Sequence, residues 1–112
     1  MKFIIDFGRS GALGIRSAWG YRCNIQGAGF GPQPTTVTND IIVDALVWVK
    51  PGGESDGGSD PNSTRFDEMC AGPNAKVPAP EAGQWFDAYV VDSIKNASPS
   101  CKCLRNLLER IS

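Results

Sequence analysis

The sequence of 112 residues contains no histidine. This absence excludes a Ser–His–Asp triad, a Cys–His pair and every metal site that uses histidine ligands. Acid–base chemistry must therefore come from aspartate, glutamate, lysine, tyrosine or cysteine. A zinc site would need all four cysteines, and the spacing of Cys23, Cys70, Cys101 and Cys103 does not fit two C-x-x-C pairs. We therefore expect neither a metal nor a cofactor.

An excess of positive charge and long hydrophobic runs are also missing. Eleven Lys and Arg residues face twelve Asp and Glu residues, whereas a nucleic-acid-binding protein needs a basic face and a membrane-surface protein a polybasic segment. We expect neither partner. No window approaches the roughly 18 apolar residues of a membrane span. The apolar run at residues 3–5 is also shorter than the roughly 7–15 apolar residues of a signal peptide.

The apolar runs that are present predict an α/β fold of one domain. Residues 45–49 are continuously apolar, as in a strand covered on both faces, and residues 3–5 predict a second buried strand with Asp6 at its end. Two such strands cannot cover their own edges, which indicates a piece of a larger sheet. The other expected elements are a helix over 12–19, a loop over 23–34, a short helix capped by Asn39 or Asp40, a helix from Pro80 to Ile94, and a short helix over 101–112.

A glycine-rich polar loop follows the stronger strand and contains Lys50, Glu54, Asp56 and Asp60. The carboxyl ends of parallel strands carry the active sites of α/β proteins, so these side chains could converge on one ligand. Carboxylates and a lysine suit a sugar, and two carboxylates are what hydrolysis of a glycosidic bond requires. A solvated surface loop has the same composition and stays an alternative.

Other sites that the sequence could encode fit less well. The loop lacks the ligand pattern of an EF-hand, and the glycines over residues 27–31 fall short of G-x-G-x-x-G. Trp19 could stack on a sugar ring. Trp48 lies in an apolar strand and Trp85 on an apolar helix face, so we expect both in the core.

Several segments follow one another in the order of one known family. They are F-I-I-D-F-G-R-S-G at residues 3–11, W-G at 19–20, C-N at 23–24, G-A-G-F-G at 27–31, V-W-V-K-P-G-G-E-S-D-G-G-S-D at 47–60, R-F-D at 65–67 with Cys70, and P-A-P-E-A-G-Q-W-F at 78–86. Together they resemble glycoside hydrolase family 6, and most closely its fungal cellobiohydrolases of the exoglucanase type.

The resemblance implies a fold, an activity and a set of site residues. Residues 1–99 would be the C-terminal portion of a distorted, TIM-like β/α barrel, incomplete on its own, and residues 100–112 a divergent tail. The family hydrolyses the β-1,4-glucosidic bonds of cellulose with inversion, outside the cell. Asp56 matches the position of the general base, and Lys50 and Glu54 match residues that bind the sugar. Cys23 and Cys70 match a family disulfide.

Departures from the family pattern limit what the chain can do alone. The proton-donor aspartate lies upstream of anything present here, and Asp6 does not match it. We therefore expect the chain to need the missing N-terminal part of the barrel as its partner, and to be inactive without it. Phe7 and Arg22 replace a glutamine and a sugar-stacking tryptophan of the family. The alternatives are a non-catalytic remnant that binds cello-oligosaccharides and a remnant that cannot fold alone.

Overall fold

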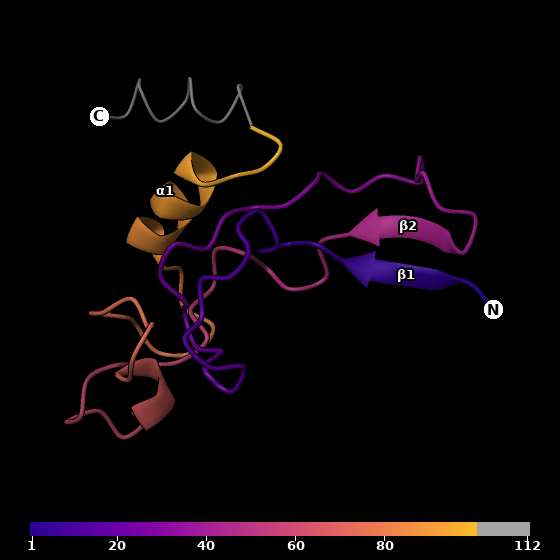
Figure 1. Ribbon diagram of the computed structural model, residues 1–112. Helices are drawn as coiled ribbons and strands as arrows, with labels where there is room; N and C mark the ends of the chain where they lie inside the picture. The colour runs from indigo at the N-terminus through magenta and orange to yellow at the C-terminus, as the bar shows by residue number, and fades with distance from the viewer. Residues whose placement is uncertain (101–112) are drawn as a thin grey trace.

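The computed structural model describes residues 1–100, so the helix predicted over 101–112 and the cysteines at 101 and 103 lie outside the described residues. Four elements form: strands β1 (Phe3–Asp6) and β2 (Val43–Val47), the 3-10 helix η1 (Glu68–Cys70) and helix α1 (Asp87–Lys95). Figure 1 shows the strands side by side, with η1 on the opposite side of the molecule. Neither described helix is long and apolar enough to cross a membrane.

β1 and β2 form a parallel pair, as the sequence predicts, with Ile4 opposite Ala45 and an irregularity just before this pair. β2 begins and ends two residues earlier than expected. It ends there because Trp48 turns inward: its indole Nε1 donates to the carbonyl of Pro32 at 2.7 Å. The ring also stacks on Phe30, with centroids 5.4 Å apart. Trp48 packs against Phe30 but is only half-buried, so it lies outside the buried core in which we expected it.

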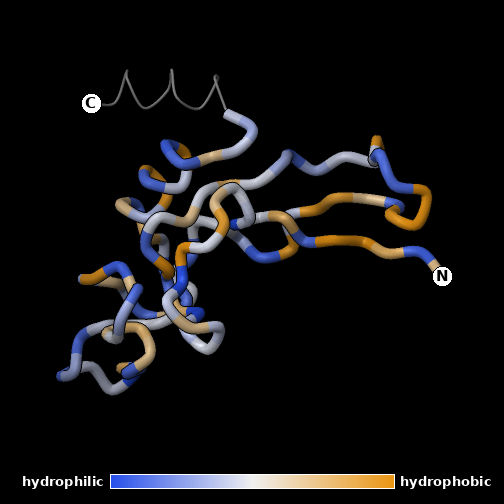
Figure 2. Tube along the Cα trace, viewed as in Figure 1, coloured by the Kyte–Doolittle hydropathy of each residue, from blue (hydrophilic) through white to orange (hydrophobic). Residues whose placement is uncertain are grey.

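The expectation that both strands are buried is wrong for the described residues. All four residues of β1 are exposed, and Ile4 retains 68% of its accessible surface. Figure 2 shows apolar residues running along both strands at the edge of the molecule. Within residues 1–100 nothing buries β1, because the chain between the strands runs as irregular loop without a crossover helix. β2 is half-buried, and its Leu46 forms an isolated bridge with Thr35 in that loop.

The helices expected between the strands do not form. Over residues 12–19 the chain turns, because Gly14 adopts φ +67°, a left-handed conformation that interrupts a helix. Further along, Asp40 does not cap a helix. Its carboxylate accepts the backbone N–H of Ile42 at 3.0 Å, and this turn leads directly into β2.

Helix α1 begins at Asp87, seven residues later than the predicted start at Pro80. Gly83 lies between the two positions with φ +84°, which a continuing helix would not allow. The delayed start leaves Trp85 outside the helix and 63% exposed, so its expected core position is wrong. The core cluster comprises Ala28, Ala79, Phe86 and Tyr89, with Ile15 packed against it.

Candidate active site

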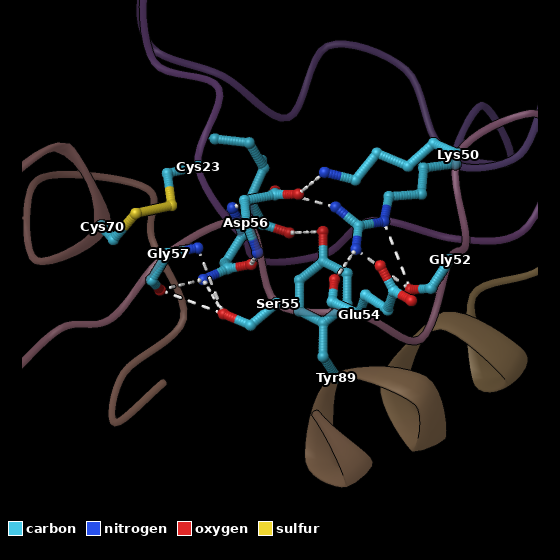
Figure 3. Close-up of polar contacts among 12 residues, drawn as sticks. Cys23, Lys50, Gly52, Glu54, Ser55, Asp56, Gly57, Cys70 and Tyr89 are labelled. Carbon is cyan, nitrogen blue, oxygen red and sulfur yellow. Dashed lines mark hydrogen bonds and ion pairs between the residues drawn. A yellow bond between two sulfur atoms is a disulfide. The ribbon is translucent and has the colours of Figure 1, made fainter. Parts of the chain in front are cut away.

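Asp56 lies in the loop after β2 and has both carboxylate oxygens engaged. Its Oδ2 accepts from Nη1 of Arg9 at 2.8 Å and from the backbone N–H of Asn24 at 2.8 Å. Its Oδ1 accepts from Nζ of Lys50. Only 14% of the side chain is exposed, and Figure 3 shows it at the centre of these contacts. The carboxylate is therefore fixed in position by donors from three separate segments.

The carboxyl end of β1 holds this loop in place. Asp6 accepts the backbone N–H of Lys50 at 3.3 Å, which joins the ends of the two parallel strands. Arg9 donates to the carbonyl of Glu54 at 2.7 Å and to that of Gly52 at 3.1 Å. Its guanidinium lies 4.7 Å from the centre of the Tyr89 ring, a cation–π contact. Arg9 thus binds the loop backbone and the Asp56 carboxylate at once.

Asn24 supports Asp56 from the opposite side and is completely buried. Its side-chain Oδ1 accepts the backbone N–H of Asp56 at 2.8 Å, and its Nδ2 donates to the carbonyl of Gly57 at 3.1 Å. The backbone of Asn24 has φ +43°, a left-handed conformation that asparagine tolerates better than most residues. This conformation lets both the backbone and the side chain of one residue bind the loop.

The disulfide between Cys23 and Cys70 is confirmed and lies next to Asn24. Gly57 packs against it so closely that a Cβ there would lie 2.5 Å from Sγ of Cys70. Real Cβ atoms do not approach sulfur that closely, so the contact requires glycine. The disulfide therefore forms a wall behind the Asp56 loop, and Figure 3 shows it beside Gly57.

The surroundings of Asp56 favour its ionised form. Burial alone would raise the pKa of this carboxyl group, but the hydrogen bonds from Lys50 and Asn24 and the charge of Arg9 outweigh it and lower the pKa below its ordinary value. Tyr89 shows the opposite balance: burial raises its pKa to about 12, against the opposing charge of Arg9. At neutral pH the Tyr89 hydroxyl is therefore protonated, and it donates to the carbonyl of Ile25 at 2.9 Å. Asp56, by contrast, is an anion at neutral pH, because its pKa is lowered.

The structure brings together only some of the residues that the sequence pointed to. Lys50 and Asp56 are in direct contact. Glu54 is half-buried, and its carboxylate makes no hydrogen bond or ion pair within residues 1–100; only its backbone joins the cluster. Asp60 is exposed and accepts the backbone N–H of Asn62 in a local turn, so it does not converge on the site. Sequence reasoning assigned no role to Arg9 or Asn24, although both lie in the matched motifs.

Two cavities open beside Asp56. The larger, of about 540 Å³, includes Trp19, Arg16 and Tyr89 in its lining, and Trp19 is 86% exposed. The smaller, of about 480 Å³, is lined by Arg9, Arg22, Cys23, Lys50, Asp56, Asp67 and Met69. Arg9, Arg22 and Asp56 line both. In the part of the chain that the structure describes, no group of three or more Cys, Asp or Glu side chains could hold a metal ion.

An ionised carboxylate at the carboxyl edge of parallel strands, flanked by cavities, places the chain among α/β proteins that hold ligands at this edge. The chain belongs to glycosyl hydrolases family 6, whose family model matches residues 1–97. It is 56% identical over 98 residues to exoglucanase 3 of Agaricus bisporus. It is 54% identical over 99 residues to 1,4-beta-D-glucan cellobiohydrolase C of Emericella nidulans. Each alignment covers 88% of this chain and 22% of the relative, so the chain spans about a fifth of their length.

Solved structures of family members have the same fold over the described residues. A family 6 enzyme from Coprinopsis cinerea matches with a TM-score of 0.85 and 58% identity, over 88% of this chain and 28% of the other. Cellobiohydrolase II of Humicola insolens, in complex with glucose and cellotetraose, matches with a TM-score of 0.84 and 50% identity, over 89% and 28%. The resemblance recognised in the sequence is therefore confirmed.

Proposed function

We propose that residues 1–99 form the C-terminal portion of a family 6 glucanase catalytic domain, with residues 100–112 as a divergent tail. In this proposal Asp56 takes the proton from the water that attacks the anomeric carbon of a β-1,4-linked glucan, and the configuration inverts. The observation that carries the proposal is the ionised Asp56 carboxylate, fixed between Arg9 and Lys50 beside two cavities. Lys50 and Glu54 bind the sugar hydroxyls.

The second carboxyl group of the reaction is the one that must protonate the leaving oxygen. Besides Asp56, the smaller cavity is lined by one further carboxylate within residues 1–100, that of Asp67. Asp67 caps η1 and accepts the backbone N–H of Met69 at 2.9 Å, so it is occupied as an acceptor and is poorly suited to donate a proton. We infer that the proton donor comes from other strands of a distorted β/α barrel.

The uncovered sheet supports the same inference. Within residues 1–100, β1 and β2 form a sheet of two strands in which the apolar side chains of β1 face solvent and those of β2 are half-buried. Free strand edges and exposed apolar faces are features that a complete barrel removes. Further parallel strands beside β1 or β2 would cover them and bring a proton donor to the same carboxyl edge. The disulfide between Cys23 and Cys70 suits an extracellular enzyme.

Fusion of this chain to the remaining barrel of a family relative tests the proposal. We expect hydrolysis of cellotetraose by the fusion, with the first-formed product in the inverted α configuration by proton NMR. Asp56→Asn should lower kcat by about 10²–10⁴-fold, the usual contribution of a general base. Asp60→Asn is the matched control, because Asp60 is exposed and outside the site. Unchanged kcat in the Asp56→Asn fusion would contradict the assigned role.

A non-catalytic sugar-binding role is the second candidate, because the described residues supply only one suitable carboxylate. The 112-residue chain alone should bind cellotetraose without releasing cellobiose, which calorimetry and product analysis can separate. Binding without turnover by the fusion as well would favour this candidate over the enzyme.

A further inference from the structure

Arg22 is a charged side chain that the proposed reaction does not use. It is exposed and lines both cavities beside Asp56. Among residues 1–100 no hydrogen-bond acceptor or carboxylate engages its guanidinium. Its backbone is nevertheless held firmly, because the next residue, Cys23, is buried and bridged to Cys70. An unpaired guanidinium therefore lines both cavities, on a residue next to the disulfide.

The cavities carry more positive than negative charge, unlike the chain as a whole. Four cationic side chains line them against two carboxylates, whereas the whole chain has a formal net charge of -1. Asp56 is already shared by Arg9 and Lys50. The remaining cations are Arg16, which donates to backbone carbonyls, and Arg22. The unbalanced charge can accept an anionic group from a ligand.

We propose that Arg22 makes this site select glucan chains that carry a carboxylate, as a uronic acid unit does, over neutral chains of the same length. The proposal rests on the glucanase function proposed above and names its substrate class. A guanidinium offers two parallel N–H donors that match the two oxygens of a carboxylate. A neutral sugar hydroxyl offers a single uncharged oxygen, which cannot match the two parallel donors in this way.

The position of Asp56 decides where the charged sugar sits. A second carboxylate placed directly over Asp56 would be repelled by the negative charge already there. Because Arg22 and Asp56 line the same two cavities, one oligosaccharide can place a neutral unit over Asp56 and an acidic unit at Arg22. The acidic unit therefore lies beside the point of cleavage, and not at it.

Calorimetric titration of the 112-residue chain tests this inference with two probes. One is cellotetraose, and the other is a tetrasaccharide of the same linkage in which one glucose carries a carboxylate at C6. We expect the acidic probe to bind about tenfold more tightly at low salt, the typical gain from a charge-assisted hydrogen bond. Raising the salt concentration should reduce this difference, because Arg22 is exposed.

Variants of Arg22 test whether this side chain causes the difference in affinity between the two probes. Arg22→Gln should bind both probes with equal affinity and keep its affinity for cellotetraose within about twofold. Arg22→Lys keeps the charge without the paired donors and should retain only part of the preference. Arg65→Gln is the matched control, because Arg65 is exposed, lines neither cavity and removes the same charge. Arg65→Gln should show the same preference for the acidic probe as the unchanged chain.

Equal binding of the two probes by the unchanged chain would overturn the inference, and so would a preference that survives in Arg22→Gln. In both cases binding of cellotetraose would leave the proposed function standing. Failure of the 112-residue chain to bind either probe would reject the inference, whereas the proposed function is judged separately, by hydrolysis of cellotetraose in the fusion.

Discussion

The ionised carboxylate of Asp56 is the acceptor for both Arg9 and Lys50. Protonation of this carboxylate should therefore lower the free energy of unfolding of the chain. Its ionised form stabilises the folded chain fully above the ordinary pKa of 3.8, and this contribution is lost as the pH falls through the lower pKa of the folded state. At pH 7, Asp56→Asn should cost about 1–3 kcal/mol, because Arg9 and Lys50 lose their acceptor. The difference should begin to narrow as the pH falls below the ordinary pKa of 3.8, where the unfolded chain binds the proton first, and should disappear only once the pH has passed the lower pKa of the folded state.

Urea unfolding at pH 7, 5 and 3 measures this difference. Asp60→Asn serves as the comparison, since Asp60 bonds only within its own turn. A difference for Asp56→Asn that stays constant from pH 7 to pH 3 would mean that the ion pairs do not stabilise the fold.

Asn24 combines a strained backbone with buried hydrogen bonds, and two substitutions can separate these effects. Asn24→Gly removes the side-chain bonds to the Asp56 loop but suits the φ of +43°. Asn24→Ala removes the same bonds and also places a residue without asparagine's tolerance in the left-handed region, which costs about 1–2 kcal/mol more. We expect both variants to be destabilised in urea unfolding, and the alanine variant more so. Equal free energies of unfolding for the two variants would show that the left-handed backbone conformation at this position does not affect stability.

The residues of the site were only partly predictable from the sequence. Lys50 and Asp56 lie six positions apart in one loop, so their meeting is a local event that composition can suggest. Arg9 lies 47 positions from Asp56, and Asn24 lies 32 positions from it. Contacts over such separations depend on the fold, and the residue types alone do not reveal them. Two signals could have pointed to Arg9: its place in the matched motif at residues 3–11, and the parallel pairing of the strands, which brings both carboxyl ends to one edge.

At the scale of the elements, the C-terminal end of α1 packs directly against the backbone of Gly29. A Cβ on Gly29 would lie 2.0 Å from the backbone carbonyl oxygen of Asn96, at the end of the helix. The neighbouring backbone forms hydrogen bonds there, from Phe30 N–H to the Ser93 carbonyl and from Ser98 N–H to the Phe30 carbonyl, both at 3.0 Å. Only a residue without a side chain permits this approach.

Gly29→Ala should therefore displace the end of α1 and cost about 1–3 kcal/mol, the range for overpacking a tight contact. Gly20→Ala is the matched substitution, because no atom lies within 4 Å of a Cβ there, and it should change stability by less than about 0.5 kcal/mol. Thermal unfolding followed by circular dichroism compares the two. Equal melting temperatures for the two variants would contradict this account of how α1 is held.

The elements themselves were predicted to different degrees for physical reasons. Both strands were found because β-branched and aromatic runs favour extended chain. The prediction that both strands are buried was wrong because an apolar sequence indicates only that a strand needs to be covered. Residues 1–100 contain no layer that covers β1, and β2 is only half-buried. The helix expected over 12–19 failed at Gly14, and α1 was started too early because the turn at Gly83 was overlooked. In both segments a glycine with positive φ interrupts the predicted helix, and the residue pattern did not reveal that conformation.

At the scale of the whole molecule, stability depends heavily on one covalent link. The core cluster is small, and chains of this length bury a limited share of their surface. The Cys23–Cys70 bridge closes 47 positions of chain, which contributes about 4 kcal/mol in the chain-entropy description. A domain of this size typically has only about 5–15 kcal/mol of net stability.

We therefore expect the double variant Cys23→Ser/Cys70→Ser to unfold at a much lower urea concentration than the unchanged chain. Its transition should also be broad, with apolar surface accessible to dye, as for a remnant that cannot fold alone. Addition of a reductant to the unchanged chain is the parallel measurement and should produce the same state. A sharp transition at an unchanged midpoint would show that packing alone suffices.

The same bridge divides the polypeptide into a covalent ring and two arms. The ring, from Cys23 to Cys70, contains β2 and Asp56, whereas β1 with Arg9 and α1 lie on the arms. One accessible part of the ring is the connection before β2, where Val37 and Ile41 are 83% and 91% exposed. A protease that cuts there opens the ring but releases no piece. The Asp56 loop then stays tethered beside Asn24, and a nicked molecule remains a single molecule until it is reduced.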